Sequence, residues 1–178
     1  MKPERKNIAL ALLLALLICP APLFLAEETI CFEAEDAAEI VKPLMIGKDN
    51  EKMVAKGRFI EIKQGAGEGE KAGGKAAYKL NFKTDGQYWL WARVWWPDSC
   101  GNSFSVALDQ GPAFTFGNDN TYNSWHWVKA MVKLDLKKGP HLLTVSNRED
   151  GIRIDQFLLT NDDKLVPVEI ENSVKPAE

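Results

Sequence analysis

Two glutamates in one short segment have the spacing of metal ligands. Glu33 and Glu35 flank Ala34 in the segment 29–35, whose Thr, Ile and Phe residues favour a β-strand. Residues i and i+2 of a strand point to the same face, so two carboxylates placed there repel each other unless a cation lies between them. Ca²⁺ prefers carboxylate and backbone oxygens and is the natural partner outside a cell. The alternative is a strand face that is solvated by water, and the spacing by itself favours this alternative.

Residues that catalyse reactions are few and lack supporting motifs. The two histidines, His126 and His141, lie in neither a G-x-S-x-G nor an H-E-x-x-H motif. Carboxylates are numerous, but a glycosidase pair is defined by the distance between two of them, which a sequence does not give. We therefore predict that the chain is not an enzyme.

Tryptophan is abundant, with six residues in the chain. Sugar rings present flat C–H faces that stack on aromatic rings, while Asn and Arg side chains hold the hydroxyl groups. Trp125 and Trp96 adjoin loops rich in Gly, Asn and Asp, so we predict that both are exposed and contact a ligand. The core is expected to take the others: Trp127 and most of Trp89, Trp91 and Trp95.

The elements that must position these residues are β-strands. In the segment 87–96, Tyr88, Leu90, Ala92 and Val94 alternate with Trp89, Trp91, Arg93 and Trp95. Period-two alternation of this kind also marks the segments 57–63, 75–82, 103–109, 127–136, 142–148 and 152–160. The dipeptide at 150–151, Asp-Gly, predicts a hairpin turn. Many short strands without a convincing amphipathic helix predict an all-β sandwich or barrel.

The first 26 residues have the features of a secretory signal peptide. Lys2, Arg5 and Lys6 precede the apolar run 8–18, which is too short for a convincing membrane span. Cleavage is expected after Ala26, and the alternative is an uncleaved membrane anchor. We predict a secreted protein with one domain over 27–162 and an extended C-terminal tail over 163–178.

The net charge limits the kinds of partner that the chain can bind, and the cysteine content limits the disulfides that it can form. The chain has 22 Lys and Arg and 25 Asp and Glu; the leader takes three basic residues and one acidic residue, which leaves 19 and 24 and a net charge of −5. Nucleic-acid binding needs clusters of Lys and Arg, so nucleic acid is excluded as a partner. Cys31 and Cys100 remain after cleavage, either as one disulfide or as two unlinked thiols.

The order of several motifs resembles that of carbohydrate-binding module families 6 and 35. Phe32-Glu33-Ala34-Glu35-Asp36-Ala37 resembles their opening strand, and Trp125-His126-Trp127 is similar to their W-x-W element. Between and after these lie segments similar to the G-x-Y-x-L-x-x-R strand (86–94), the strand that follows it (103–109), the G-x-H-x-L turn (139–143) and the closing strand (151–160). The resemblance implies a galactose-binding-like, jelly-roll β-sandwich.

The resemblance also implies two sites. A structural Ca²⁺ would be held by Glu33, Glu35 and Asp155, with backbone carbonyls near Lys56. A glycan would stack on Trp125, with Asn102 as a hydrogen-bonding neighbour. The second aromatic wall could come from Trp95 or Trp96, of which we expect Trp96.

One departure from the family concerns the sugar site. The closing strand of these families often carries a ligand-binding Asn where this chain has Arg153. A guanidinium binds a carboxylate through two parallel hydrogen bonds, so we predict a preference for uronic-acid or other anionic glycans. The alternative is that Arg153 pairs with Asp150 or Glu149 at the surface.

These observations predict a secreted, non-catalytic module that binds a polysaccharide or glycan and carries a structural calcium. Two alternatives remain: a structural or protein-interaction sandwich without sugar binding, with other secreted proteins as partners, and a glycan-active enzyme.

Overall fold

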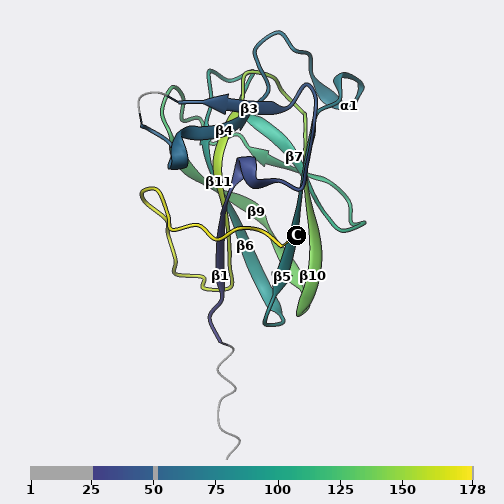
Figure 1. Ribbon diagram of the computed structural model, residues 1–178, viewed down its shortest axis with the longest axis vertical. Helices are drawn as coiled ribbons and strands as arrows, with labels where there is room; N and C mark the ends of the chain where they lie inside the picture. The colour runs from purple at the N-terminus through teal and green to yellow at the C-terminus, as the bar shows by residue number, and fades with distance from the viewer. Residues whose placement is uncertain (1–25, 50–51, 178) are drawn as a thin grey trace, which may run out of the picture.

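The computed structural model describes residues 26–49 and 52–177, so the predicted signal peptide lies outside the described residues except for Ala26. Within this part of the chain, eleven strands form two antiparallel sheets (Figure 1). The predicted all-β sandwich is confirmed. No helix of the described residues is long and apolar enough to cross a membrane.

The sheet that carries the candidate site, here called sheet A, has five strands in the order β3 (Met45–Lys48), β4 (Arg58–Glu61), β11 (Arg153–Thr160), β6 (Gly86–Trp95) and β9 (His126–Leu136). A sixth strand, β1 (Thr29–Glu33), pairs with β11 as well. Because β4 pairs with Arg153 and Ile154 whereas β1 pairs with 156–160, the two strands follow one another along the same side of β11.

Sheet B contains β2 (Glu39–Val41), β5 (Lys75–Phe82), β10 (Gly139–Ser146), β7 (Ser103–Leu108) and β8 (Phe114–Gly117), in that order. Three short helices connect strands: η1 (Ala34–Asp36), η2 (Ala55–Gly57) and α1 (Gly69–Ala72). The hydrophobic core lies between the sheets.

The side chains of strand β6 alternate between the core and the outer face of sheet A. Its residues Tyr88, Leu90, Ala92 and Val94 share one face, as their alternation predicts, and they are fully buried in the core between the sheets. The tryptophans that were expected in this core lie outside it: Trp91 is buried in a second cluster, against which Trp89 and Trp127 pack. The intervening residues Trp89, Trp91, Arg93 and Trp95 therefore lie on the outer face. Strand β9 supplies the neighbours on that face, with Trp127 opposite Arg93, Lys129 opposite Trp91 and Lys133 opposite Trp89.

The C-terminal tail is extended and runs across this outer face. The side chain of Gln156 donates to the carbonyl oxygen of Glu171 (2.9 Å) and accepts from its amide (3.0 Å). Farther along, the amide of Val174 donates to the carbonyl of Cys31 on β1, and that of Ala177 to Lys79 on β5. Figure 1 shows the tail crossing β1 and ending beside β5.

The predicted hairpin at 150–151 is wrong. Asp150 and Gly151 connect β10 of sheet B to β11 of sheet A, so the two strands do not pair with each other. Of the two residues only Gly151 has a positive φ, of 80°, whereas Asp150 is buried and accepts a hydrogen bond from the amide of Gly67 (3.0 Å). The two cysteines are unlinked: Cys31 is buried and Cys100 is exposed.

Candidate functional site

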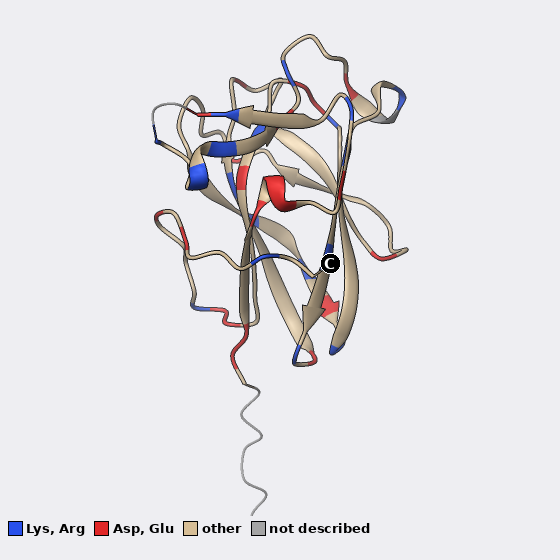
Figure 2. Ribbon diagram, in the orientation of Figure 1, with Lys and Arg blue, Asp and Glu red and all other residues tan. Residues whose placement is uncertain are grey.

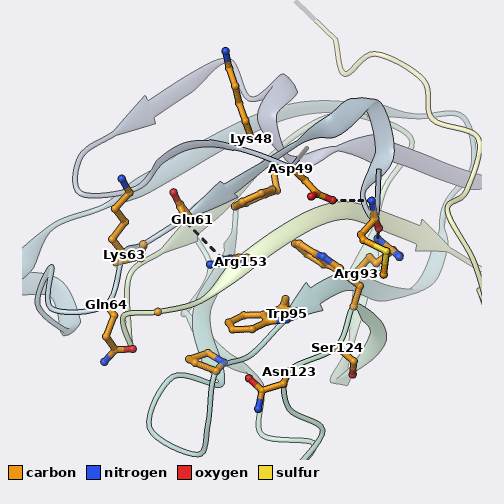
Figure 3. Close-up of a pocket in the computed structure, with 16 residues that line it drawn as sticks. Lys48, Asp49, Glu61, Lys63, Gln64, Arg93, Trp95, Asn123, Ser124 and Arg153 are labelled. Carbon is orange, nitrogen blue, oxygen red and sulfur yellow. Dashed lines mark hydrogen bonds and ion pairs between the residues drawn. The ribbon is translucent and has the colours of Figure 1, made fainter. Parts of the chain in front are cut away.

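A cavity of about 1080 Å³ opens on the outer face of sheet A, where β4, β6 and β11 meet (Figure 3). Lys48 and Lys63 lie on its β3–β4 side, and Asn123 and Ser124 lie across from them. It brings together cationic, aromatic and amide side chains, which are the groups that bind sugars. The residues that line it are Lys48, Asp49, Met53, Phe59, Glu61, Ile62, Lys63, Gln64, Arg93, Trp95, Pro97, Asn123, Ser124, Trp125, Gly151 and Arg153.

Arg153 lies between two aromatic rings of this cavity. Its guanidinium carbon is 4.4 Å from the centroid of the Trp95 ring and 5.5 Å from that of Phe59. Its Nε lies 3.7 Å from a carboxylate oxygen of Glu61, an ion pair that is too long for a hydrogen bond. Within the described part of the chain no hydrogen bond occupies its two Nη atoms, which leaves them as donors for a ligand.

Trp125 forms the neighbouring wall of the same cavity. Its ring centroid is 5.6 Å from that of Phe59, at an interplanar angle of 59°. The guanidinium carbon of Arg93 lies 5.6 Å from the Trp125 centroid. Nη1 of Arg93 donates to the Met53 carbonyl (3.0 Å) and to Asp155 (2.6 Å), so Arg93 links Trp125 to the strands beneath it.

Two of the four predicted sugar ligands do not line this cavity. Trp96, predicted to be exposed, is fully buried, and its indole nitrogen donates to Asp119 (3.1 Å). The reason is strand alternation, since Trp96 continues the inward-facing series of Tyr88 to Val94. Asn102 is only 3% exposed: its backbone N–H donates to the carboxylate of Glu149 (3.0 Å), and its side-chain Nδ2 donates to the Tyr122 hydroxyl (3.5 Å).

Trp95 takes the place that was assigned to Trp96. It is partly exposed, lines the cavity and stacks on Arg153. The alternative partners of Arg153 are both occupied, because Glu149 pairs with Arg148 and Asp150 accepts from Gly67. The structure thus brings Trp125 and Arg153 together, and adds Trp95 and Phe59.

The three predicted calcium ligands are buried carboxylates with different surroundings. The predicted strand face shared by Glu33 and Glu35 is wrong, because β1 ends at Glu33 and Glu35 lies in the helix η1. Glu33 and Glu35 lie beside two cations, with Lys56 Nζ 3.6 Å from Glu33 Oε1 and Arg58 Nε 3.3 Å from Glu35 Oε1. Figure 2 shows this acidic segment beside the basic start of β4. Nevertheless Oε2 of Glu33 and both carboxylate oxygens of Glu35 are buried without a hydrogen-bond partner, and burial raises the pKa of Glu35.

Both carboxylate oxygens of Asp155 already accept hydrogen bonds from the protein. One of its oxygens accepts from the amide of Ala55 (3.0 Å) and the other from Arg93 (2.6 Å). Burial raises its pKa to about 7 although both hydrogen bonds oppose the shift. In the described ranges no three His, Cys, Asp or Glu side chains form a ready-made metal site. The Oε2 atoms of Glu33 and Glu35 have no partner and fit a calcium ion, which prefers such ligands. Oε1 of Glu33 already accepts from Gln156 and Oε1 of Glu35 pairs with Arg58, and Asp155 would have to release Arg93.

Comparison with known proteins gives one curated relative. No family model matches the sequence. An uncharacterized protein of Formosa agariphila is 29% identical over an alignment of 111 residues that covers 52% of this chain. The aligned part is 26% of that protein, so the chain spans about a quarter of the curated relative it matches.

Solved structures match over most of the chain. A β-(1,4)-mannanase of Podospora anserina with a family 35 module has a TM-score of 0.60 and 18% identity over 78% of this chain, but the match covers only 29% of that enzyme. A family 35 module of Clostridium thermocellum (TM-score 0.56, 14% identity) matches 74% of this chain and 97% of its own length. A family 6 module of Cellvibrio mixtus in complex with cellotriose (0.56, 16%) matches 74% and 95%. This chain has the β-sandwich fold of family 6 and family 35 carbohydrate-binding modules.

Proposed function

We propose that this chain is a secreted, non-catalytic module that binds a glycan in the cavity of Trp125 and Arg153. The observation that carries the proposal is the cavity itself, in which two partly exposed tryptophans and a guanidinium with free donors line one hollow on the sheet. Fold similarity to modules such as the cellotriose-bound one supports a carbohydrate ligand.

The charges of the cavity favour an anionic glycan. Four cations line it, Lys48, Lys63, Arg93 and Arg153, against the two carboxylates of Asp49 and Glu61. Within the described residues Arg93 pairs with Asp155 and Arg153 forms only the long ion pair to Glu61, whereas the two lysines form none. A carboxylate or sulfate group of a sugar would accept from the free Nη atoms of Arg153. A neutral sugar gains no comparable charge-assisted bond, so binding should discriminate between the two.

Calorimetry with a short uronic-acid oligosaccharide and a neutral oligosaccharide of equal length tests this proposal. Trp125→Ala should abolish binding of both sugars in this cavity, since it removes the stacking surface, and Arg153→Ala should remove the preference of the cavity for the anionic sugar. Lys42→Ala, at an exposed lysine outside the cavity, is the control and should bind like wild type. Wild-type affinity in Trp125→Ala would refute the site and favour a structural or protein-interaction sandwich.

We further propose a structural Ca²⁺ held by Glu33 and Glu35. An ion that binds only the folded chain stabilises it by about 2.7 kcal/mol at a hundredfold excess over its dissociation constant. EDTA should therefore lower the melting temperature of the wild type, and Glu35→Ala should abolish this effect. Glu39→Ala, which removes an exposed acid on β2, should keep it. Identical melting curves with and without EDTA would exclude the calcium.

Secretion is the remaining part of the proposal. It rests on the basic and apolar character of the first 26 residues. Mass spectrometry of the exported protein should find an N-terminus near Glu27. An intact Met1 on a membrane-bound product would contradict it.

A further inference from the structure

A second hollow lies on the outer face of sheet A, toward the other end of β6. It has a volume of about 330 Å³ and is lined by Glu27, Gly86, Gln87, Trp89, Lys133, Asn161 and Asp163. Trp89 is six positions before Trp95, so the two hollows are roughly 20 Å apart along one strand. The C-terminal tail crosses the face between them, since its Glu169 carbonyl accepts from the Trp127 indole (2.7 Å).

Two lysines of β9 converge on the ring of Trp89. Nζ of Lys129 is 3.8 Å from its centroid and Nζ of Lys133 is 4.8 Å from it. Lys129 also lies 5.3 Å from the ring of Trp91. A bulge in β9 causes this convergence, because only two positions of β6 separate Trp89 from Trp91 while four positions of β9 separate their partners.

Neither lysine is neutralised by the protein. In the part of the chain that the structure describes, Lys129 and Lys133 form no ion pair, although Glu27 and Asp163 also line the hollow. Two ammonium groups beside one ring repel each other, and an anion that bridges them relieves the repulsion. The side chain of Asn161 lines the hollow but is not free to bind a sugar, because it accepts from the Glu28 amide and donates to the Ala26 carbonyl. Gln87 is exposed and has no partner within the described residues.

We propose that Trp89, Lys129 and Lys133 form a second binding site for an anionic sugar, so that one polyanionic glycan chain engages both hollows of sheet A. The inference rests on the proposed function of the Trp125 cavity but uses different residues. The sugar carries a carboxylate or sulfate group that accepts from the two ammonium groups, and its ring lies beside Trp89. Linking two sites through one ligand raises the affinity far above that of either alone, by up to 10²–10⁴-fold.

Calorimetry with four probes tests the site: a short uronic-acid oligosaccharide, alginate as a polyuronate, dextran sulfate, and dextran as a neutral control. The main variant is the double substitution Lys129→Gln and Lys133→Gln, which keeps two outward-facing side chains and removes both charges. Trp89→Ala is the second variant. The matched control is Lys42→Gln with Lys71→Gln, the same charge change at exposed lysines outside both hollows.

The wild type should bind two short oligosaccharides per chain, and the lysine double variant only one. Its affinity for the long polyanion should fall at least about tenfold, since the second contact is lost. Loss of binding to alginate, to dextran sulfate or to both supports the site and identifies the anion that it takes. Unchanged stoichiometry and affinity in the lysine variant would overturn it, and so would an equal loss in the Lys42 and Lys71 control.

The Trp125→Ala variant separates this inference from the proposed function. If the Trp89 site is real, one short oligosaccharide should still bind after Trp125 is removed. Two sites remaining in Trp125→Ala, with one lost in the lysine variant, would refute the cavity of Trp125 and leave the Trp89 site standing. Complete loss of oligosaccharide binding in Trp125→Ala, with wild-type binding by the lysine double variant, would refute the Trp89 site and leave the cavity of Trp125 standing.

Discussion

At the scale of single residues, the guanidinium of Arg153 contacts aromatic rings more closely than it contacts a carboxylate. Its guanidinium lies 4.4 Å from the Trp95 centroid, whereas its ion pair with Glu61 is 3.7 Å long and partly exposed to solvent. A planar guanidinium stacks on aromatic rings and binds carboxylates through two parallel bonds, and an ammonium does neither. The contact with the Trp95 ring orients the guanidinium and its free Nη atoms. A lysine of the same charge therefore cannot replace Arg153 in binding an anionic ligand.

Arg153→Lys should therefore weaken binding of an anionic oligosaccharide by roughly fivefold to tenfold, although the charge is kept. The melting temperature should change little, because the substituted side chain remains at the cavity surface. Calorimetry and a thermal melt on the same sample measure both quantities. Equal affinity of the two proteins would show that only the positive charge matters.

His141 provides a second prediction at this scale. Its Nδ1 is 2.8 Å from a carboxylate oxygen of Asp109 and its Nε2 is 2.8 Å from the Lys137 carbonyl, so the doubly protonated ring satisfies both acceptors. Partial burial lowers the pKa of His141, but these hydrogen bonds outweigh it and raise the pKa above 6.5. Partial burial raises the pKa of Asp109, but hydrogen bonds from the Leu142 amide and His141 outweigh it and lower the pKa.

The sign of the pH effect follows from these shifts. A raised folded-state pKa of His141 means stability that is fully present below pH 6.5 and is lost as the pH rises through the folded value. The wild type should thus lose melting temperature from pH 6 to pH 8 to a greater extent than His141→Gln does. If the melting temperatures of the two proteins change equally between pH 6 and pH 8, the raised pKa of His141 is not the source of the pH effect.

Strand alternation determines which tryptophan lines the cavity, and in part this was predictable. The alternation places Tyr88, Leu90, Ala92 and Val94 on one face of the strand without indicating which face is the core, and Trp96 continues that series by the same rule. Trp95 belongs to the outward series of Trp89, Trp91 and Arg93. The position of Phe59 beneath Arg153 depends on contacts between strands that are distant in sequence, so no local pattern indicates it.

At the scale of elements, the long strands were predictable and the short ones were not. The segment 75–82 is a strand with the predicted bounds, because eight residues give a clear alternation. Strands β2, β3 and β8 have only three or four residues, too few for a period to be recognised. The Asp150-Gly151 turn was misread because local turn chemistry does not indicate in which sheet the next strand lies.

The C-terminal tail is an element without regular structure that covers part of sheet A. Leu165 packs against a small outer cluster of Cys31, Trp91 and Leu158. Without the tail these apolar side chains would be exposed, and the hydrogen bonds to Trp127 and Gln156 would be lost. The tail therefore contributes to the stability of the sandwich.

Removal of residues 163–178 should destabilise the fold by about 2 kcal/mol, which lowers the melting temperature by roughly 4–8 °C. Leu165→Ala should reproduce part of this loss through reduced apolar burial. Val168→Ala should have no effect, because Val168 is 81% exposed. A truncated protein that melts at the wild-type temperature would show that the tail only lies on the sheet.

At the scale of the whole molecule, charge is unevenly distributed. Residues 27–178 carry a net charge of −5, yet both hollows of sheet A contain lysines without ion pairs among the described residues. Long-range repulsion of a polyanion by the net charge is screened over about 8 Å at physiological ionic strength. Local attraction by Arg153 and the lysines acts at shorter range, at the sites themselves.

If local attraction dominates, the affinity for alginate should fall as the salt concentration rises from about 50 to 300 mM, since screening weakens exposed charge pairs. Binding of a neutral oligosaccharide in the Trp125 cavity should stay unchanged, because stacking does not depend on ions. The Arg153→Ala variant should show a smaller salt dependence for alginate than the wild type. Titrations at several salt concentrations give these slopes directly. An affinity for alginate that rises with salt would mean that the net negative charge governs the encounter, and the anionic preference would then be wrong.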